Sequence, residues 1–424
     1  MMDCVERLWK EPAPVLALNP GHGLRAESAL DPKIFAAVRR RVAVEGYKWD
    51  SQVGDVTALA SFPLVMKRSI WEKLATWAER LSGETTEAEK EILGRAEFLG
   101  VLGLPRALEQ ILAEDAPLTP TAGRVIRFDF HFTTEGWRIS EANSDVPGGF
   151  SEASYFTALM AEYFSDLKLA GNPGAIWSDS LASVAKPGGV VALLFAPGYM
   201  EDCQVVSFLA ARLRERGCLA HLAKPEQICW HNGQAHLTAS WHRGPLDAIV
   251  RFYQAEWLAR LPHEPGWRHL FRGGKTPTAN PAPAVISESK RFPLVWQKVK
   301  AALPTWRALL PETRDPRNAP WSSDDGWLVK SAMCNTGDTV SIRSSMPRNQ
   351  WLQTRLRVSL SPHKWVAQRR FESVPVSTPI GSRHFCVGVY TVNGRAAGAY
   401  ARLAEKPLID FAAVDVALLI EEDD

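Results

Sequence analysis

The residues with the clearest capacity for chemistry lie in one short stretch, from Arg127 to Asn143. Polar and apolar side chains alternate along its first half, which is the pattern of a β-strand with one buried face. Because residues two apart share a face of a strand, Arg127, Asp129 and His131 point the same way. A glycine-containing turn then leads into a second strand, on which Glu141 and Asn143 share a face. The stretch therefore predicts a β-hairpin with one polar, acidic face.

The turn of this hairpin decides which side chains meet. A three-residue loop over 134–136, with its glycine in the left-handed conformation, is a common connection and pairs Thr133 with Trp137. Counting back from that pair brings two pairs of polar residues face to face: Asp129 with Glu141, and Arg127 with Asn143. Cross-strand neighbours lie about 5 Å apart at Cβ. We therefore expect all four side chains to be in contact.

Two facing carboxylates repel each other unless a cation offsets their charge. Mg²⁺ prefers hard oxygen ligands, and the amide of Asn143 would add a neutral one. Arg127 beside such a metal suits a phosphate or a transferring phosphoryl group. The hairpin thus predicts a site for a metal and a polyphosphate. A surface hairpin with a solvated polar face, in which Arg127 pairs with Asp129 or Glu141, fits the same pattern, and the sequence leaves both interpretations open.

Residues late in the chain are candidates for binding a nucleotide. Lys330 ends an apolar strand and precedes a turn that contains Gly337, an arrangement that can hold phosphates. Lys290 and Arg402 supply further cations, and the segment that begins at Gln368 can meet an adenine edge through its backbone. Each also has a plainer explanation: a lysine at a helix start, a solvated or carboxylate-paired arginine, and an edge strand.

The elements that position these residues change in type along the chain. Residues 1–120 indicate mainly helix, and periodic apolar residues place the helices at 31–44, 63–81 and 86–98. The hairpin belongs to residues 121–170, with a helix over 151–163. Residues 186–274 alternate strand and helix, which predicts a small α/β domain. Its expected elements are a buried parallel strand at 190–195, a helix at 204–216, and strands at 219–222 and 248–251.

Residues 275–424 mix helix and strand again. We expect a helix over 289–303, strands at 327–330, 339–342 and 365–368, and a hairpin of 384–390 with 396–403. The hairpin prediction depends on Asn393-Gly394, a strong turn signal. The chain as a whole is therefore expected to be an α+β or α/β protein.

The composition excludes several classes of protein. Lys and Arg number 49 and Asp and Glu 47, so the net charge of +2 argues against a dedicated nucleic-acid binder. No apolar run reaches the roughly 18–20 residues that span a bilayer, and the first residues carry no secretory signal pattern. The six cysteines form no CxxC pair, so we expect a reduced, cytoplasmic protein rather than a disulfide scaffold or zinc protein.

Taken together, the motifs resemble those of the glutathionylspermidine synthetase-like family of ATP-grasp ligases. The resemblance depends on an Arg-x-Asp motif followed by Glu-x-Asn-x-Asp-x-Pro, at 127–129 and 141–147. Weaker pieces follow in the same order: Asn280-Pro281, Ser289-Lys290, 328–330, 366–368, 381–385 and 398–402. The resemblance implies a circularly permuted ATP-grasp fold, with metal ligands early in the chain and nucleotide-binding residues late. Residues 186–274 would then be the small pre-ATP-grasp-type domain, and 275–424 the ATP-binding lobe.

The resemblance also implies a role for each candidate. Asp129, Glu141 and Asn143 would hold Mg²⁺, and Arg127 and Arg402 would stabilise the phosphoryl group or an acyl-phosphate. Lys290 and Lys330 would bind the phosphates of ATP, Gln368 the adenine, and Gly337 would belong to the loop that closes over the phosphates. The implied activity is the ATP-dependent joining of a small-molecule or peptide carboxylate to an amine, with release of ADP and phosphate.

One departure from the family pattern bears on activity. The loop after Lys330 has Asn335 where the family has an arginine, and the loss of that cation would weaken stabilisation of the transition state by a few kcal/mol. A nucleotide-binding scaffold with reduced catalysis is therefore an alternative, and so is a phosphotransferase. The substrates stay open, because glutathione and spermidine are only the namesakes of the family. The candidates for the walls of an amine pocket are acidic and aromatic: Asp145, Glu152, Glu256, Trp241, Tyr253 and Trp257.

Overall fold

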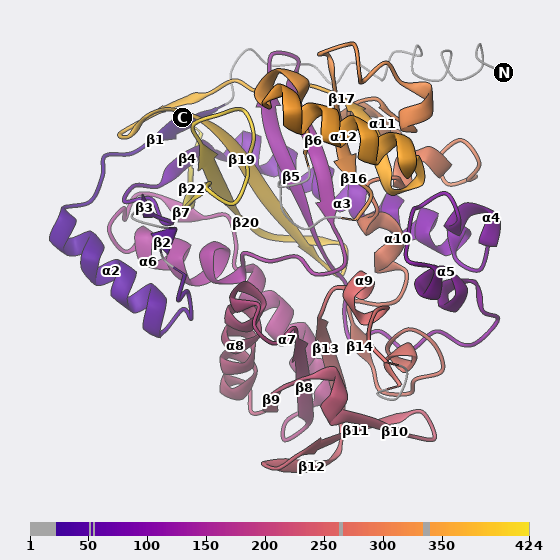
Figure 1. Ribbon diagram of the computed structural model, residues 1–424. Coiled ribbons are helices and arrows are strands. Elements are labelled where there is room, and N and C mark those ends of the chain that lie inside the picture. Colours follow the sequence, from indigo (N-terminus) through magenta and orange to yellow (C-terminus); the bar gives the residue numbers. More distant parts are fainter. Residues whose placement is uncertain (1–22, 51, 54–55, 263–265, 334–339, 424) are drawn as a thin grey trace.

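The structure is a computed structural model and describes residues 23–50, 52–53, 56–262, 266–333 and 340–423 (Figure 1). Its centre is a six-stranded antiparallel sheet in the order β21-β20-β19-β5-β6, with β18 paired to β19. The strands are β5 (Val125–Thr133), β6 (Gly136–Asn143), β18 (Val376–Thr378), β19 (Gly381–Val392), β20 (Arg395–Ala404) and β21 (Val414–Val416). The expected hairpin of β19 and β20 is confirmed, and its turn residues Asn393 and Gly394 both have positive φ.

The hairpin of β5 and β6 keeps the predicted register at the site but reaches it by another route. Thr133 pairs with Gly136, so the turn has two residues and the expected pairing with Trp137 is wrong. The Thr133 hydroxyl donates to the Gly136 carbonyl at 2.7 Å and accepts from the Glu135 amide, which tightens the turn. A bulge at Ser140 adds one residue to β6 and so restores the predicted pairing beyond it. Asp129 therefore does pair with Glu141, and Arg127 with Asn143, as predicted.

One face of the central sheet is apolar and covered by helices. Phe128 and Phe130 are fully buried on it, and Phe128 meets Trp306 of α11 (Pro304–Leu309) edge to face. The long helix α3 (Arg68–Ile92) crosses behind the same sheet (Figure 1). The opposite face carries the polar side chains of the predicted site. The alternation of the sequence thus separates core from site, as expected.

The N-terminal residues differ in part from the expected helices. The helix at 31–44 is confirmed as α2 (Pro32–Val44). The helix expected over 63–81 is wrong at its start, because β4 (Leu64–Lys67) pairs with β1 (Leu24–Ala26) and the C-terminal β22 (Leu418–Glu421) before α3 begins. A separate helix at 86–98 is also wrong, since α3 continues to Ile92 and only α4 (Ala96–Leu99) follows. Tertiary strand pairing here overrides local helix periodicity.

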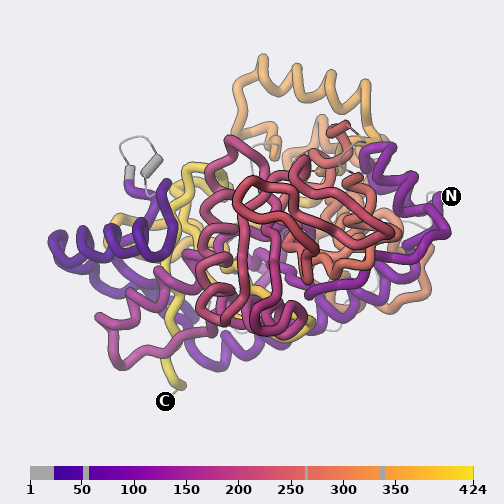
Figure 2. Tube along the Cα trace, turned by 90° about the horizontal axis from the view of Figure 1, so that it is seen from below, coloured from indigo at the N-terminus to yellow at the C-terminus, as the bar shows by residue number. Residues whose placement is uncertain are grey.

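The strands and the helix expected between residues 190 and 251 are present, with small shifts at their ends. A parallel sheet has the order β14-β13-β8-β9, and the helices α7 and α8 pack on it. Seen from below, this part lies in front of the rest of the molecule (Figure 2). The elements are α7 (Pro173–Ala185), β8 (Val190–Phe195), α8 (Met200–Glu215), β9 (Leu219–Ala223), β13 (Ala248–Phe252) and β14 (Thr278–Ala279), with α9 (Ala255–Leu258) and a three-stranded sheet of β10 (Ile228–His231), β11 (Gln234–Ala239) and β12 (His242–Pro245) attached.

Residues 313–369 form a lobe above the central sheet in Figure 1. Its antiparallel sheet has the order β15-β17-β16, from β15 (Thr313–Arg314), β16 (Trp327–Ser331) and β17 (Trp365–Arg369), and α12 (Arg348–Leu360) belongs to it. The helix expected over 289–303 is wrong: α10 (Ala284–Glu288) precedes Lys290, and Pro293 starts only a short 3₁₀ turn because it cannot donate a backbone hydrogen bond. The strand expected at 339–342 is an isolated bridge at Ser341.

The remaining short elements complete the left side of Figure 1. They are β2 (Gln52–Val53), β3 (Val56–Thr57), a π-helical turn at Ser151–Phe156, α6 (Thr157–Ala161) and β7 (Lys168–Leu169), while α5 (Arg106–Ala113) lies beside α4. The helix expected at 151–163 is therefore present but begins as a π-helix. Across the described residues, no helix has both the length and the apolar character to cross a bilayer.

Candidate active site

Two arginines share one carboxylate at the centre of the polar sheet face. Asp129 accepts from Arg127 through both of its oxygens, at 2.7 and 3.1 Å, and from Arg402 at 2.8 Å. Asn143 donates its amide nitrogen to the same carboxylate at 3.3 Å. Asp129 is 1% exposed. The four residues come from β5, β6 and β20, so the central sheet holds them in fixed positions.

Charge explains why this buried carboxylate stays ionised. Burial alone would raise the pKa of Asp129, but Arg127 and Arg402 outweigh that effect and lower the pKa to about 2. For neighbouring His131, burial outweighs the opposing charges of Asp129 and Glu141. Burial lowers its pKa to about 4, so its imidazole is neutral at pH 7.

The second carboxylate of the hairpin meets the two predicted lysines. Lys290 Nζ lies 3.3 Å from Glu141 and 3.2 Å from Glu288. Lys330 Nζ donates to the Ser140 carbonyl at 2.9 Å. Burial opposes ionisation of Glu141, but Lys290 and Lys330 lower its pKa. The structure therefore brings Glu141 of the early hairpin and the late lysines together, although 149 and 189 positions separate it from Lys290 and Lys330 in the sequence.

A pocket with apolar walls opens beside this cluster. Its volume is about 110 Å³, and it lies between the central sheet and the strands β16 and β17. The apolar lining comprises Leu328, Val340, Ile342, Phe371, Pro407, Leu408 and Ile409. Its polar end holds Arg127, Asp129, Glu141, Lys330 and Arg402. A flat apolar group with a charged tail would fit this distribution.

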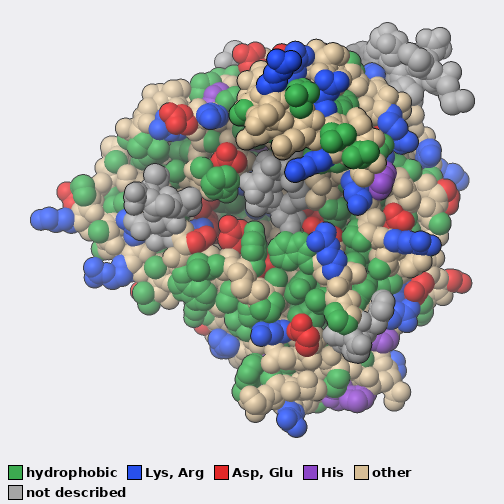
Figure 3. Space-filling model, viewed as in Figure 1, with side chains coloured by type: hydrophobic (Ala, Val, Ile, Leu, Met, Phe, Trp, Pro, Cys, Tyr) green, Lys and Arg blue, Asp and Glu red, His purple; other side chains and the backbone are tan. Residues whose placement is uncertain are grey.

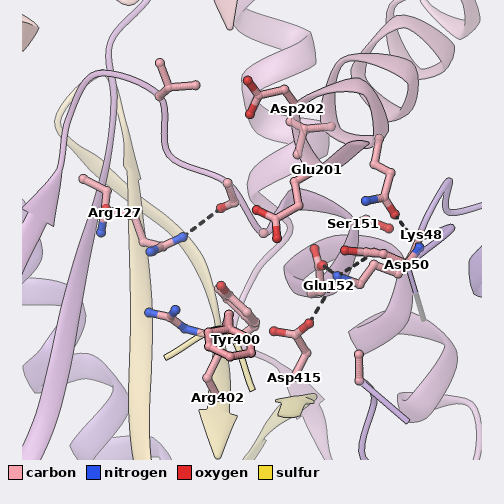
Figure 4. A pocket seen from close by; sticks show the side chains of 18 of the residues that line it. Lys48, Asp50, Arg127, Ser151, Glu152, Glu201, Asp202, Tyr400, Arg402 and Asp415 are labelled. Carbon is pink, nitrogen blue, oxygen red and sulfur yellow. Dashed lines mark hydrogen bonds and ion pairs between the residues drawn. The ribbon is translucent and has the colours of Figure 1, made fainter. Parts of the chain in front are cut away.

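A second pocket, of about 200 Å³, lies on the other side of the two arginines. We call it the acidic pocket, because carboxylates dominate its wall: Asp50, Glu152, Glu201, Asp202, Glu288, Asp410 and Asp415. Figure 3 shows acidic side chains around the hollow at the centre of this face of the molecule. In Figure 4, Glu201 and Asp202 approach from α8, whereas Glu152 and Asp415 lie opposite.

Arg127 and Arg402 line both pockets. Tyr400 stands beside them at the wall of the acidic pocket, with its ring 6.0 Å from the Arg127 guanidinium (Figure 4). Arg127 also donates to the Gly148 carbonyl at 3.1 Å, which holds its guanidinium between the pockets. A group that enters from either pocket therefore meets the same pair of cations.

The protonation of the acidic pocket is unusual. Burial, and then the charge of Glu201, raises the pKa of Asp202 to about 8. Burial, and then Asp50, raises the pKa of Glu201. These two side chains thus lie where a negative charge is poorly compensated by the protein. A cationic ligand would supply the missing charge.

Two of the predictions for site residues need a separate comment, that for Gln368 and that for the loop with Gly337. Gln368 is buried and bonds to Thr313 at 3.0 Å, and β17 is the central strand of its sheet. The edge-strand explanation for Gln368 is therefore wrong. Gly337 and Asn335 lie outside the described residues, so the role of their loop over the phosphates stays a prediction.

Of the residues suggested for the wall of an amine pocket, only Glu152 lines the acidic pocket. Asp145 is instead buried in an ion pair with Arg251 and accepts from the Ala255 amide at 2.8 Å. Trp241 is 59% exposed, and Trp257 packs behind Tyr199, which does line the pocket.

Sequence reasoning missed most of the acidic pocket. Lys48 and Asp50 lie in a loop after α2, and Asp415 belongs to β21, where no motif marks them. Glu201 and Asp202 did carry a signal. They follow the turn at the carboxyl end of a predicted parallel strand, which is where α/β sheets place their ligands.

The oxygen donors of the hairpin suit a hard divalent cation. Asp129 and Glu141 are ionised, and the Asn143 nitrogen faces Asp129, which leaves its amide oxygen to serve as a ligand. Two carboxylates and an amide are donors that Mg²⁺ accepts. Within the described ranges, no group of three or more His, Cys, Asp or Glu forms a metal centre, so any such site would need Asn143 and a bound phosphate.

Comparison with known proteins shows the fold and the family of the chain. A glutathione synthetase-like effector from Globodera pallida has the same fold, with a TM-score of 0.58 at 10% identity over 92% of this chain and 97% of that one. A gamma-glutamylcysteine synthetase-type protein from Methylobacillus flagellatus KT aligns with a TM-score of only 0.37, at 12% identity over 81% and 87% of the two chains. No curated protein matches the sequence.

The family model of the glutathionylspermidine synthase preATP-grasp group matches residues 33–421, and the fold is accordingly the α+β architecture of ATP-grasp-type synthetases. The chain belongs to the glutathionylspermidine synthase preATP-grasp family.

Proposed function

We propose that the protein is an ATP-dependent carboxylate–amine ligase that works through an acyl-phosphate. The observation that carries this proposal is the position of Arg127 and Arg402, which line both the apolar-walled pocket and the acidic pocket. A phosphoryl group passed from a nucleotide in one pocket to a carboxylate in the other would cross between these two guanidinium groups. Membership of a synthase family supports the same class of reaction.

The apolar-walled pocket is the proposed site of ATP. Its apolar lining suits the adenine ring, and both Gln368 and Phe371, which lies just beyond β17, line the pocket, so the base would meet Gln368 and the residues that follow it. The phosphates would extend toward Lys330 and Lys290. Both lysines hold positions beside Glu141, where they attract the charge of a polyphosphate.

Asp129, Glu141 and Asn143 would hold Mg²⁺ at the phosphate end of this pocket. The cation would supply charge neutralisation between the phosphate oxygens and the two carboxylates. Arg127 and Arg402 would then offer guanidinium donors to the transferring phosphoryl group. Such fixed donors act without reorganisation at the moment of reaction, and each is worth about 10²–10³ in rate.

The acidic pocket would hold the amine. In the first step, a carboxylate oxygen attacks the γ-phosphorus of ATP, the bond to the bridging oxygen breaks, and ADP leaves. In the second, the amine nitrogen attacks the acyl carbon, phosphate departs, and the amine loses a proton. The raised pKa values of Glu201 and Asp202 show that their ionised forms lack a cationic partner, which a substrate arriving as an ammonium ion would supply. Positioning and electrostatics are the main contributions of the protein.

The proposal is tested by ADP release from the purified protein with Mg·ATP, measured against a crossed panel of carboxylates and amines. The panel pairs amino acids, glutathione and short peptides with polyamines and amino acids. A ligase forms ADP only when one acid and one amine are both present, and the mass of the product shows an amide without phosphate. A phosphorylated product would establish a phosphotransferase instead. Tight ATP binding with no ADP in any mixture would favour the scaffold.

A further inference from the structure

A lysine of the protein itself occupies part of the acidic pocket. Lys48 Nζ lies 2.7 Å from Glu152, 3.1 Å from Asp50 and 3.3 Å from Asp415. The carboxylates come from a loop, the π-helical turn and β21, and Figure 4 shows them around the Lys48 side chain. Lys48 is 8% exposed. An ammonium group has three N–H donors, and here three carboxylates surround it.

The charge balance keeps this lysine protonated. Burial would lower the pKa of Lys48, but Glu152, Asp415 and Asp50 raise it well above its usual value. The arrangement is therefore an ammonium subsite that the chain fills with its own side chain. A free primary amine would need the same three acceptors.

Glu201 and Asp202 form the other half of the pocket, where compensation is weaker: Lys48 and Arg402 lower the pKa of Glu201, but burial and Asp50 outweigh them. Asp202 is 4% exposed and interacts with the Gln254 side chain, but among the described residues its Oδ2 atom has no hydrogen-bond partner. Gln254 is equally buried, lines the same pocket and has an unpartnered Oε1 atom. Buried acceptors of this kind are normally satisfied. A donor group from a ligand would satisfy both of them and offset the charge of Glu201.

We propose that Lys48 determines substrate specificity by occupying one of two ammonium subsites. The amine substrate would then be a short monoamine or diamine held at Glu201 and Asp202, and a third cationic group on the substrate would find its place taken. The role of the bound amine as a substrate rests on the proposed ligase function. The binding preference itself is independent of catalysis.

The test compares the affinities of n-butylamine, putrescine and spermidine by calorimetry, in the wild-type protein and in Lys48→Ala. The wild type should bind spermidine at most about threefold more tightly than putrescine. Lys48→Ala exposes Asp50, Glu152 and Asp415, so the ratio should shift at least tenfold in favour of spermidine. Lys48→Met removes the charge but fills the space, and should shift the ratio less. Lys33→Ala removes an exposed lysine of α2 and should change nothing.

Two outcomes would overturn the inference. One is a wild-type protein that already binds spermidine more than tenfold more tightly than putrescine. This comparison needs no variant and decides the matter if Lys48→Ala does not fold. The other is a folded Lys48→Ala protein with an unchanged ratio. If amine-dependent ADP release persists in either case, only the role of Lys48 fails. If amines bind as expected but no ADP forms, only the ligase proposal fails.

Discussion

Arg402 and Asp129 form an ion pair of 2.8 Å although a whole strand separates them. Arg402 is on β20 and Asp129 on β5, and β19 lies between these two strands. The pair can form because β19 carries Gly388 directly beside Asp129 on one side and Tyr400 on the other. The Arg127 side chain extends over the space that a larger residue would take. One carboxylate thereby orients both guanidinium groups.

Gly388→Ala should therefore impair activity much more than stability. An added Cβ would lie 2.9 Å from Arg127 Cδ and 3.2 Å from the Tyr400 ring, so the guanidinium must move. We expect a fall in kcat of about 100-fold and a loss of stability of about 1–3 kcal/mol. Steady-state kinetics and thermal unfolding measure both.

Gly83→Ala is the matched control for this substitution. Gly83 is exposed in α3, and a Cβ there meets nothing within 4 Å. That variant should retain full activity and gain up to about 1 kcal/mol, because alanine favours the helix. Normal kinetics in Gly388→Ala would contradict the packing described for Arg127.

Neutralising Asp129 should destabilise the protein much more than neutralising Glu141. Asp129→Asn leaves the buried Arg127 and the half-buried Arg402 without their shared partner, which should cost about 3–5 kcal/mol. Glu141→Gln should cost about 1 kcal/mol or less, because its side chain is 24% exposed and Lys290 keeps Glu288 as a partner. Both should lower ATP-dependent turnover at least 100-fold. Denaturant unfolding and ADP release provide the two readings.

Glu135→Gln serves as the control for both carboxylates. Its side chain is 72% exposed at the turn of the same hairpin, and it forms an i,i+3 ion pair with Arg138. It should behave as wild type in both measurements. Full turnover in Asp129→Asn or Glu141→Gln would exclude these residues as metal ligands.

The stability of the protein should fall with rising pH because of Asp202. The pKa of this side chain is raised from 3.8 to about 8, so between these values the folded state binds a proton that the unfolded state has released. Stability is therefore highest below pH 4 with respect to this group and is lost up to about pH 8, at no more than about 1.4 kcal/mol per pH unit. Asp202→Asn should flatten that decline.

Urea unfolding at several pH values between 5 and 8 measures the slope. The exposed Asp166→Asn controls for the loss of one charge and should keep the wild-type slope. An Asp202→Asn variant with the wild-type slope would show that Asp202 is ionised in the folded protein at neutral pH.

Asp145 should matter for folding rather than for chemistry. It is buried in contact with Arg251, which is 1% exposed and reaches from β13 of the small α/β part. Asp145→Asn should destabilise the protein by about 3–5 kcal/mol, since Asp145 is the one carboxylate among the described residues that pairs with Arg251. At a temperature where the variant is folded, kcat should stay within about threefold of wild type. A selective loss of kcat without a loss of stability would assign Asp145 to the reaction.

The polar face of the hairpin was predictable because strand periodicity is a local property. The alternation around Asp129 fixed which side chains face the core, and the predicted pairing with Glu141 is confirmed. The turn and the bulge that produce this pairing were not predictable. The tight turn at Thr133 and the bulge at Ser140 shift the register by one residue in opposite directions, and neither has a distinctive sequence signal.

The acidic pocket could not be assembled from the sequence for a different reason. Lys48, Glu152 and Asp415 are separated by more than 100 residues from one another, and only the packing of three elements joins them. The wrong prediction of a helix over 289–303 could have been avoided from the sequence, because Pro293 argues against a helix that continues through that position. The strand β4 was hidden because its partner β22 lies at the far end of the chain.

The measurement that tests the central claim most directly is oxygen transfer. The carboxylate identified by the ADP-release panel is labelled with ¹⁸O and incubated with Mg·ATP, its amine and the protein, and the released phosphate is analysed by mass. If an acyl-phosphate forms between Arg127 and Arg402, one labelled oxygen passes from the acid to the phosphate in every turnover. Phosphate without label, released in step with ADP, would contradict the account.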